Sequence, residues 1–303
     1  MRNLEKYTLK AMIDRTIENF GERPALSMVE GQSLTYNDLR LMIDEVIALM
    51  ISSGVAPGDR VAILSQNMPH WGVAYLAITS MGAIVVPILV DFHNTEILHI
   101  LKHSGAKLVF VSETQYEKIG YSELEPYPVM VNLDSFNLIP PQISRDRLKD
   151  VIREGGITLQ KIRNKAFKAV GLIKTEVQED DIAALIYTSG TTGSSKGVML
   201  THRNLVMDAI LTLGIQKLDE NDRLISVLPL SHTYECTIGF IIPMMQGAAI
   251  YYLDKPPTAR ILIPAMQKIK PTMILTVPLI IEKIFKLQIH PQLTGNIVYR
   301  ELY

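Results

Sequence analysis

The chain has 303 residues, of which 48% are hydrophobic and 20% charged, so it is long enough to bury more than one hydrophobic core. Its formal net charge of -1 excludes the basic excess that general binding to nucleic acid requires. The single cysteine, Cys236, excludes an internal disulfide framework and is typical of a reducing compartment. We therefore expect a globular protein with two packed lobes.

Residues 1–20 mix charges into a helical pattern without a continuous apolar core, which is not typical of a signal peptide. Two uncharged stretches, 72–90 and 236–253, approach the length of a membrane span. Pro87 interrupts the first and Pro243 the second, which favours a buried helix followed by a buried strand in each. The expected location is cytoplasmic, and peripheral contact with a membrane stays open.

The first half of the sequence alternates helix and strand patterns. Residues 34–54 predict a helix in which Thr35 and Asp38 have the spacing of a capping box and Gly54 provides the stop. One face of that helix is apolar and should lie on a core, with Leu39, Ile43, Val46, Ile47 and Met50. Further along, strands are predicted at 59–64, 83–89 and 107–112, and helices at 72–82 and 94–105. This alternation predicts a mainly parallel sheet that is covered by helices on both faces.

Residues 143–170 are polar and rich in Arg and Lys, which predicts a solvated helical linker at the end of a first α/β lobe, 1–180. A second α/β lobe is predicted for 181–303. This lobe also combines strand and helix patterns. Strands are predicted at 182–188, 198–200, 223–230, 248–253 and 272–277, and helices at 202–214, 258–269 and 278–285.

The stretch "YTSGTTGSSKGVMLTH", residues 187–202, follows the first strand of the second lobe. Gly190 and Gly193 allow consecutive backbone N–H groups to converge on one point as an anion-binding nest. Lys196 adds a mobile positive charge. Hydroxyl donors surround it at Thr188, Ser189, Thr191, Thr192, Ser194 and Ser195. The sequence therefore predicts a loop that binds a polyphosphate.

Two other interpretations of the loop fit less well. A Walker P-loop needs a second glycine where Ser195 stands, and a helix start where "VML" predicts a strand. A plain hairpin turn needs only two to five loop residues, and this loop is longer and built around a lysine.

At these residues the sequence closely resembles the adenylate-forming superfamily, which comprises acyl-CoA synthetases, luciferases and adenylation domains and shares a "YTSGTTGxPKGV" signature. One departure is Ser195, where proline is usual. Other stretches resemble family segments in family order: "SLTYNDL", "GDRVAIL", "MGAIVVPIL", "HSGAKLVFVS" and "PTMILTVPLIIEKIF". The resemblance implies an α/β fold, namely the large N-terminal domain of these enzymes, with parallel-sheet lobes covered by helices and incomplete at its C-terminus.

The segment "LPLSHTYECT", residues 228–237, resembles the family's acyl-pocket segment, which implies that His232 and Tyr234 stand near the substrate carboxylate. Its H-x-aromatic-Glu pattern most resembles long-chain fatty acyl-CoA synthetases. Without the family, His232 and Glu235 are spaced like two metal ligands, but no second pair accompanies them, so a buried structural histidine is the alternative. Tyr234 could equally be a core aromatic residue.

The resemblance also implies the chemistry. The acid's carboxylate attacks ATP to give an acyl-adenylate and pyrophosphate, and coenzyme A then takes the acyl group as a thioester. ATP, Mg²⁺ and coenzyme A are thus the implied cofactor and co-substrates. His232 is the implied catalytic residue bordering the carboxylate, and Thr188 the implied metal ligand. The implied phosphate-binding residues are Thr188, Ser189, Gly190, Thr191, Thr192, Gly193, Ser194 and Lys196.

Nothing in the sequence resembles the family's Tyr-Gly-x-Thr-Glu segment, its ribose-binding aspartate, its hinge or its small C-terminal domain with the adenylation lysine. We therefore expect the N-terminal fragment of a long-chain fatty acid–CoA ligase with little activity alone. A non-catalytic nucleotide-binding or partner-regulated module is one alternative, and a ligase for an aryl or amino acid is another. The expected partner is a fatty acid or other carboxylic acid, not nucleic acid, and self-association stays open.

Overall fold

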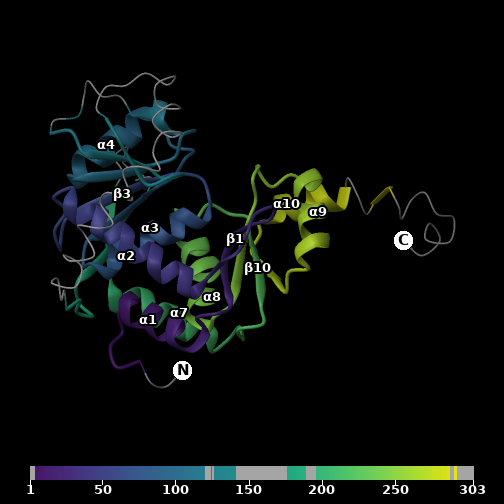
Figure 1. Ribbon diagram of the computed structural model, residues 1–303. Coiled ribbons are helices and arrows are strands. Elements are labelled where there is room, and N and C mark those ends of the chain that lie inside the picture. Colours follow the sequence, from purple (N-terminus) through teal and green to yellow (C-terminus); the bar gives the residue numbers. More distant parts are fainter. Residues whose placement is uncertain are drawn as a thin grey trace.

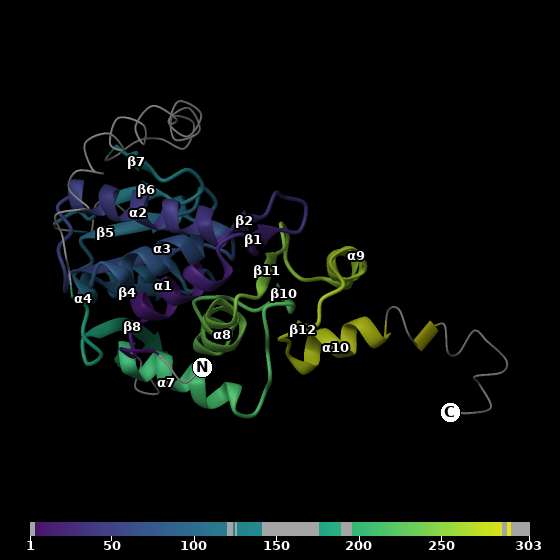
Figure 2. The same cartoon turned by 60° about the horizontal axis from the view of Figure 1, so that its bottom comes forward.

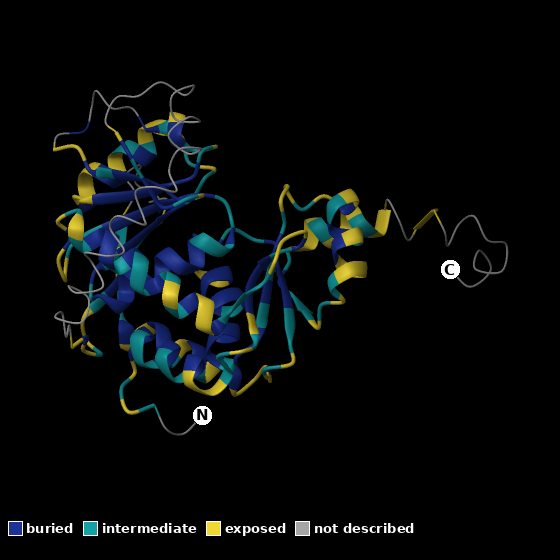
Figure 3. Cartoon of the chain, viewed as in Figure 1, coloured by how far each residue is buried: buried dark blue, intermediate teal, exposed yellow. Residues whose placement is uncertain are grey.

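The computed structural model describes residues 4–119, 124, 126–140, 176–188, 196–286 and 290–291. Two β-sheets, with helices between and around them, form the body of the protein (Figure 1). Buried residues are concentrated in the strands and in the helices between the sheets (Figure 3). The mixed α/β class with mainly parallel sheets, predicted from the sequence, is confirmed.

In the part of the chain that the structure describes, the larger sheet has seven strands. Its inner pairs are parallel, and an antiparallel pair closes each edge. In spatial order the strands are β7 (Asn137–Ile139), β6 (Val129–Asn132), β5 (Leu108–Val111), β3 (Arg60–Leu64), β4 (Ile84–Ile88), β8 (Ile182–Thr188) and β9 (Lys196–Thr201).

Among the described residues, the smaller sheet has five strands, whose neighbours run parallel except for β1 and β2. In spatial order these are β12 (Met273–Ile274), β10 (Arg223–Ser226), β11 (Ala249–Tyr252), β1 (Pro24–Met28) and β2 (Leu34–Thr35). Each sheet thus combines strands from both sides of residue 180. The division of the chain into lobes at that residue stays a prediction.

Helices fill the space between the sheets and cover their outer faces (Figure 1; Figure 2). The α-helices are α1 (Leu9–Phe20), α2 (Tyr36–Ser52), α3 (Pro69–Ser80), α4 (Asn94–Ser104), α7 (His202–Leu213), α8 (Ile242–Gln246), α9 (Ala259–Ile269) and α10 (Pro278–Ile284). The described residues also include a 3₁₀ turn, η1 (Tyr116–Lys118), and a π-helix, η3 (Glu235–Ile241). None of the helices in the described ranges is long and apolar enough to cross a membrane.

Successive side chains of β3, β4 and β5 point to opposite faces of the larger sheet, and helices cover both faces. Side chains on one face, including Val61 and Phe110, pack in a core with α2 and α3, whereas those on the other face, including Leu64 and Val109, pack against α4. The helix α3 contacts both β1 and β3–β4, so it lies between the two sheets. It is buried from Trp71 to Ser80, as the uncharged stretch at 72–90 predicts.

The helix predicted at 34–54 is confirmed as α2. Thr35 caps it in a capping box with Asp38, and Gly54 follows with φ +83°, a left-handed conformation that favours glycine. Of the predicted apolar face, Leu39, Ile43, Val46 and Met50 are buried and Ile47 is partly buried.

Other predictions differ in detail from the structure. The strand predicted at 223–230 ends at Ser226, because the chain turns there into a loop that leads to η3. The π-helical form of residues 235–241 was not predicted, although the helix-then-strand pattern at 236–253 is confirmed by η3, α8 and β11. The linker predicted at 143–170 lies outside the described residues.

Candidate functional site

A cleft opens where strands from both sheets end. Parallel strands place their carboxyl ends at one edge, where ligands bind in open α/β sheets. The cleft has a volume of about 410 Å³. Its lining comes from the larger sheet (Ser65, Gln66, Asn67, Val90, Thr114, Gln115) and from the smaller sheet and its loops (Ser226, Val227, Pro229, Ser231, Leu253, Asp254, Lys255, Pro256, Pro257).

The predicted phosphate loop begins at the carboxyl end of β8. Thr188 and Lys196 are exposed and stand opposite each other as the last pair of the β8–β9 ladder. Residues 189–195, which contain the other predicted phosphate-binding residues, lie outside the described residues. Just before the loop, the Tyr187 hydroxyl lies 2.6 Å from His103 Nδ1 and fixes the end of β8 to α4.

His232 and Tyr234 lie in the short segment between β10 and η3, and both are exposed. The backbone N–H of Tyr234 donates to His232 Nδ1 at 3.3 Å. With Nδ1 as acceptor, the ring hydrogen is on Nε2, so Nε2–H is the donor that the imidazole offers outward. His232 is exposed, so the alternative of a buried histidine is wrong, whereas its catalytic role stays a prediction.

Glu235 does not join His232 in a metal site. Its carboxyl is buried and accepts a hydrogen bond from Ser226 Oγ at 2.7 Å. Burial raises its pKa to about 7, although bonds from Ser226 and from the backbone of Val227 and Leu228 act in the opposite direction. Within the described ranges, no group of three or more His, Cys, Asp or Glu side chains could hold a metal ion.

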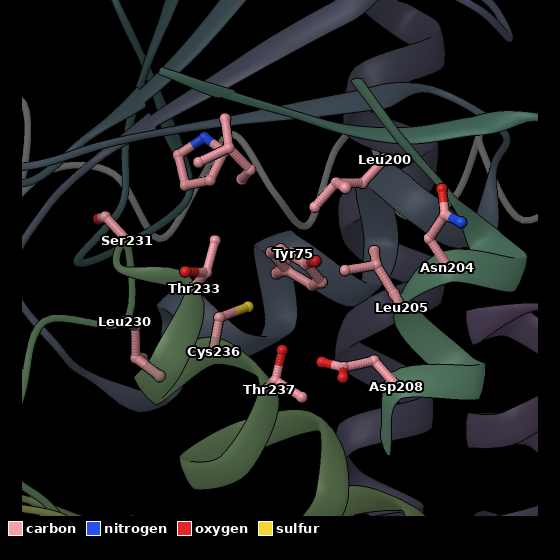
Figure 4. A pocket seen from close by; sticks show the side chains of 12 residues that line it. Tyr75, Leu200, Asn204, Leu205, Asp208, Leu230, Ser231, Thr233, Cys236 and Thr237 are labelled. Atoms are coloured by element: carbon pink, nitrogen blue, oxygen red, sulfur yellow. The ribbon is translucent and has the colours of Figure 1, made fainter. Parts of the chain in front are cut away.

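A second cavity, of about 360 Å³, lies beside the same segment (Figure 4). It is mostly apolar, and Thr233, the neighbour of His232, forms part of its wall. Figure 4 shows the Tyr75 ring and the Cys236 thiol facing its interior, with Thr237 beside Cys236 and Asp208 facing Thr237. The full lining is Tyr75, Pro87, Ile186, Leu200, Asn204, Leu205, Asp208, Leu230, Ser231, Thr233, Cys236 and Thr237.

Sequence reasoning missed several residues that shape this region. Asn67 bonds the 226–230 segment, Tyr75 reaches the second cavity from α3, and Asp208 stands at the end of that cavity on α7. None carries a local signal, because each lies far along the chain from the residues that it meets.

Comparison with known proteins gives the same fold. The N-terminal domain of FACL13 from Mycobacterium tuberculosis superposes with a TM-score of 0.76 at 21% identity, covering 93% of this chain and 65% of that one. A fatty acyl CoA synthetase from the same organism gives a TM-score of 0.76 at 20% identity, covering 96% and 53%. At these identities the likeness shows the fold alone, which is that of the N-terminal domain of adenylate-forming enzymes.

The sequence comparisons lead from this class to a family. The model of the AMP-binding enzyme family matches residues 13–300, and the chain belongs to that family. A 3-[(3aS,4S,7aS)-7a-methyl-1,5-dioxo-octahydro-1H-inden-4-yl]propanoyl:CoA ligase from Mycobacterium tuberculosis is 29% identical, over 80% of this chain and 46% of its own length. The 4-coumarate–CoA ligase 1 of Arabidopsis thaliana is 28% identical, over 92% and 49%. The chain thus spans about half the length of these relatives.

Proposed function

We propose that this chain is the N-terminal part of an ATP-dependent ligase that activates a fatty acid as an acyl-adenylate and transfers it to coenzyme A. The observation that carries the proposal is the apolar cavity beside His232. It offers a place for a long apolar tail, and its wall includes Ser231 and Thr233, the two chain neighbours of His232. The family membership and the CoA ligases among the relatives support the reaction class.

Thr188 and Lys196 suit the polyphosphate of ATP. Both are exposed at the mouth of the same loop, and no ion pair is found for Lys196 among the residues that the structure describes. Lys196 would neutralise charge on the phosphates. When bound, Mg²⁺ supplies further neutralisation; Thr188 fits as one oxygen ligand, and such ions commonly take their others from phosphate and water.

His232 would orient the acid. Its Nε2–H points away from the bond at Nδ1, so it can donate to one carboxylate oxygen and leave the other to attack. The protein need not supply a nucleophile, because the reaction depends on holding two anions in line with preorganised donors. Tyr234, also exposed, would border the same carboxylate.

The apolar tail would lie in the cavity of about 360 Å³ between β8, β9, α7 and η3. Asn204 and Asp208, at its α7 end, are exposed, so the cavity reaches the surface there. Each methylene that enters adds roughly 0.8 kcal/mol of binding free energy. The affinity for the acid should therefore rise with the length of its acyl chain until the acyl chain reaches the opening of the cavity.

Ligation of another acid is the second candidate. The relatives named above act on 4-coumarate and on a bicyclic propanoate, which are bulkier and shorter than a fatty acid. Such an acid would fill the part of the cavity near Thr233 and leave the α7 end empty.

Isothermal titration calorimetry tests the proposal. The 303-residue chain is titrated with n-alkanoates of 4 to 16 carbons and with 4-coumarate. Affinity that rises stepwise with chain length supports a fatty acid. Tighter binding of 4-coumarate than of any alkanoate supports the second candidate. Binding of ATP without binding of any acid contradicts both and supports a nucleotide-binding module. We also expect no clear ATP–pyrophosphate exchange from this chain alone.

A further inference from the structure

Asn67 ties the segment that carries His232 to the larger sheet. Asn67 follows β3, and its Nδ2 donates to Ser226 Oγ at 2.9 Å and to the carbonyl oxygen of Leu228 at 2.6 Å. In return, the backbone N–H of Leu230 donates to Asn67 Oδ1 at 2.8 Å. One amide side chain thus holds three points of residues 226–230, which belong to the smaller sheet and its loop.

Glu235, which follows the same segment, also bonds to its first residue. Its carboxyl accepts from Ser226 Oγ at 2.7 Å, and the nearby backbone of Val227 and Leu228 acts to lower its pKa. The start of the loop is therefore bonded to the first residue of the helix that follows it. His232 and Tyr234 lie between these two anchored ends.

The bonds form one connected path. It runs from the end of β3 through Asn67 to Ser226 at the end of β10, and from Ser226 to Glu235 at the start of η3. Ser231 adds a separate bond, from its Oγ to the carbonyl oxygen of Ile88 at 3.0 Å. The two sheets and the helix are thus fixed to one another on both sides of the exposed His232 along the chain.

A stabilising role alone explains this arrangement poorly. A buried carboxyl is costly to desolvate, and apolar residues of similar volume in such places are often neutral or stabilising. Glu235 Oε2 is buried and has no hydrogen-bond partner, so the cost is only partly offset. Polar networks of this kind instead select one arrangement of the groups around them.

We propose that Asn67 and Glu235 are positioning residues, which hold the 227–234 loop in the one arrangement that exposes His232 and Tyr234 beside Ser231 and Thr233, which line the cleft and the apolar cavity. The identity of the acid that these residues receive rests on the proposed function. The proposal that Asn67 and Glu235 hold the loop does not depend on the proposed function. Neither residue lines the apolar cavity, so any effect on an acid bound there passes through the loop.

Amide hydrogen exchange of the 303-residue chain tests the holding directly. The informative amides are those of His232 and Cys236, which donate to the backbone carbonyls of Pro229 and His232 and so lose no partner in either variant. In Asn67→Ala and in Glu235→Ala, exchange at both amides should rise at least tenfold while amides of α4 stay unchanged. Glu235→Gln keeps an oxygen for Ser226 and should restore most of the protection.

Asn132→Ala is the matched control. Asn132 is fully buried, whereas Asn67 is partly buried; the Asn132 Oδ1 accepts from the backbone N–H and the hydroxyl of Ser135, and Asn132 lies at the turn between β6 and β7. Its loss should lower global stability and leave His232 and Cys236 protected. Equal exchange in Asn67→Ala and the wild type, or an equal rise in Asn132→Ala, overturns the proposal. If Glu235→Ala fails to fold, the comparison of Asn67→Ala with Asn132→Ala still decides between these outcomes.

Dodecanoate binding separates this proposal from the proposed function. If the wild type binds dodecanoate, Asn67→Ala should weaken binding at least fivefold and Asn132→Ala should not. Unchanged affinity in Asn67→Ala overturns the link to the acid. If the wild type binds no acid, the proposed function fails, whereas the exchange experiment still decides whether the loop is held.

Discussion

The Glu235 carboxyl lies directly against the backbone of Gly239, four residues later in the π-helix. A β-carbon at position 239 would lie 2.7 Å from Glu235 Cδ and 2.8 Å from Oε1. Because the carboxyl is also bonded to Ser226, it cannot move aside without losing that bond. Glycine at 239 and the glutamate at 235 therefore depend on each other.

Gly239→Ala should lower the free energy of unfolding by about 1–3 kcal/mol, since the added methyl group must displace a buried, bonded carboxyl. Urea denaturation of the wild type and the variant measures this loss. The control is the same change in a Glu235→Ala background, where the space is free and the loss should nearly vanish. Equal losses in both backgrounds would show that the clash is not with Glu235.

Glu235 should make stability depend on pH near neutrality. Its folded pKa of about 7 lies above its ordinary 4.5, so the folded protein binds the proton more tightly than the unfolded chain. The contribution is fully present below about pH 4.5 and is lost as pH rises through 7. Relative to Glu235→Gln, the wild type should lose up to roughly 3 kcal/mol across this window. Urea denaturation at pH 5 and pH 8 measures it, and a constant difference between the two proteins would contradict it.

His202 should give the opposite dependence. It is fully buried at the start of α7, and its Nδ1 accepts the backbone N–H of Leu9 at 3.2 Å. Burial lowers its pKa to about 4, although the charge of Asp181 acts in the opposite direction. The unfolded chain therefore takes up a proton below pH 6.5 that the folded protein does not.

His202→Asn keeps an acceptor for Leu9 and removes the titration. Relative to this variant, the wild type should lose up to roughly 3 kcal/mol of unfolding free energy as pH falls from 6.5 to 4. Guanidinium denaturation at pH 7 and pH 5 provides the comparison. A difference that stays the same, or that grows in favour of the wild type at pH 5, would mean that His202 is charged in the folded protein.

Local patterns in the sequence predicted the elements well, because their causes are local. The capping box at Thr35 and Asp38 and the stop at Gly54 bound α2 as expected. Such local patterns could not predict contacts between residues that are far apart in the sequence. The spacing of His232 and Glu235 suggested a shared metal, yet burial directs Glu235 to Ser226, and its other contacts are set by the tertiary packing. Asn67 lies 159 residues from Ser226, and no local motif marks such a pair.

The resemblance predicted residues of a site but could not predict the shape of the cavity beside them. It directed attention to His232 and Tyr234, which are exposed beside a cleft and a cavity. It could not give the shape of the cavity, because Tyr75, Leu200 and Asp208 come together there from three separate elements.

Lys196→Ala should weaken binding of tripolyphosphate and of ATP about tenfold, because it removes one charge-assisted contact at the phosphate loop. Calorimetric titration at constant ionic strength measures the change. Lys196→Arg keeps the charge and should recover part of the affinity. Lys217→Ala removes an exposed lysine that follows α7 and should have no effect. Equal weakening by both alanine variants would indicate a non-specific electrostatic contribution.

Thr237→Phe should shorten the apolar cavity. Thr237 belongs to η3, is almost fully buried and faces the cavity near Asp208 (Figure 4). The added ring would occupy the α7 end, so dodecanoate should bind at least tenfold more weakly while butanoate, which stays near Thr233, should be little affected. The variant's melting temperature checks that the larger side chain is accommodated. Ile215→Phe places the same ring at an exposed position and should leave both affinities unchanged. Equal loss for both acids in Thr237→Phe would mean that the tail does not run toward α7.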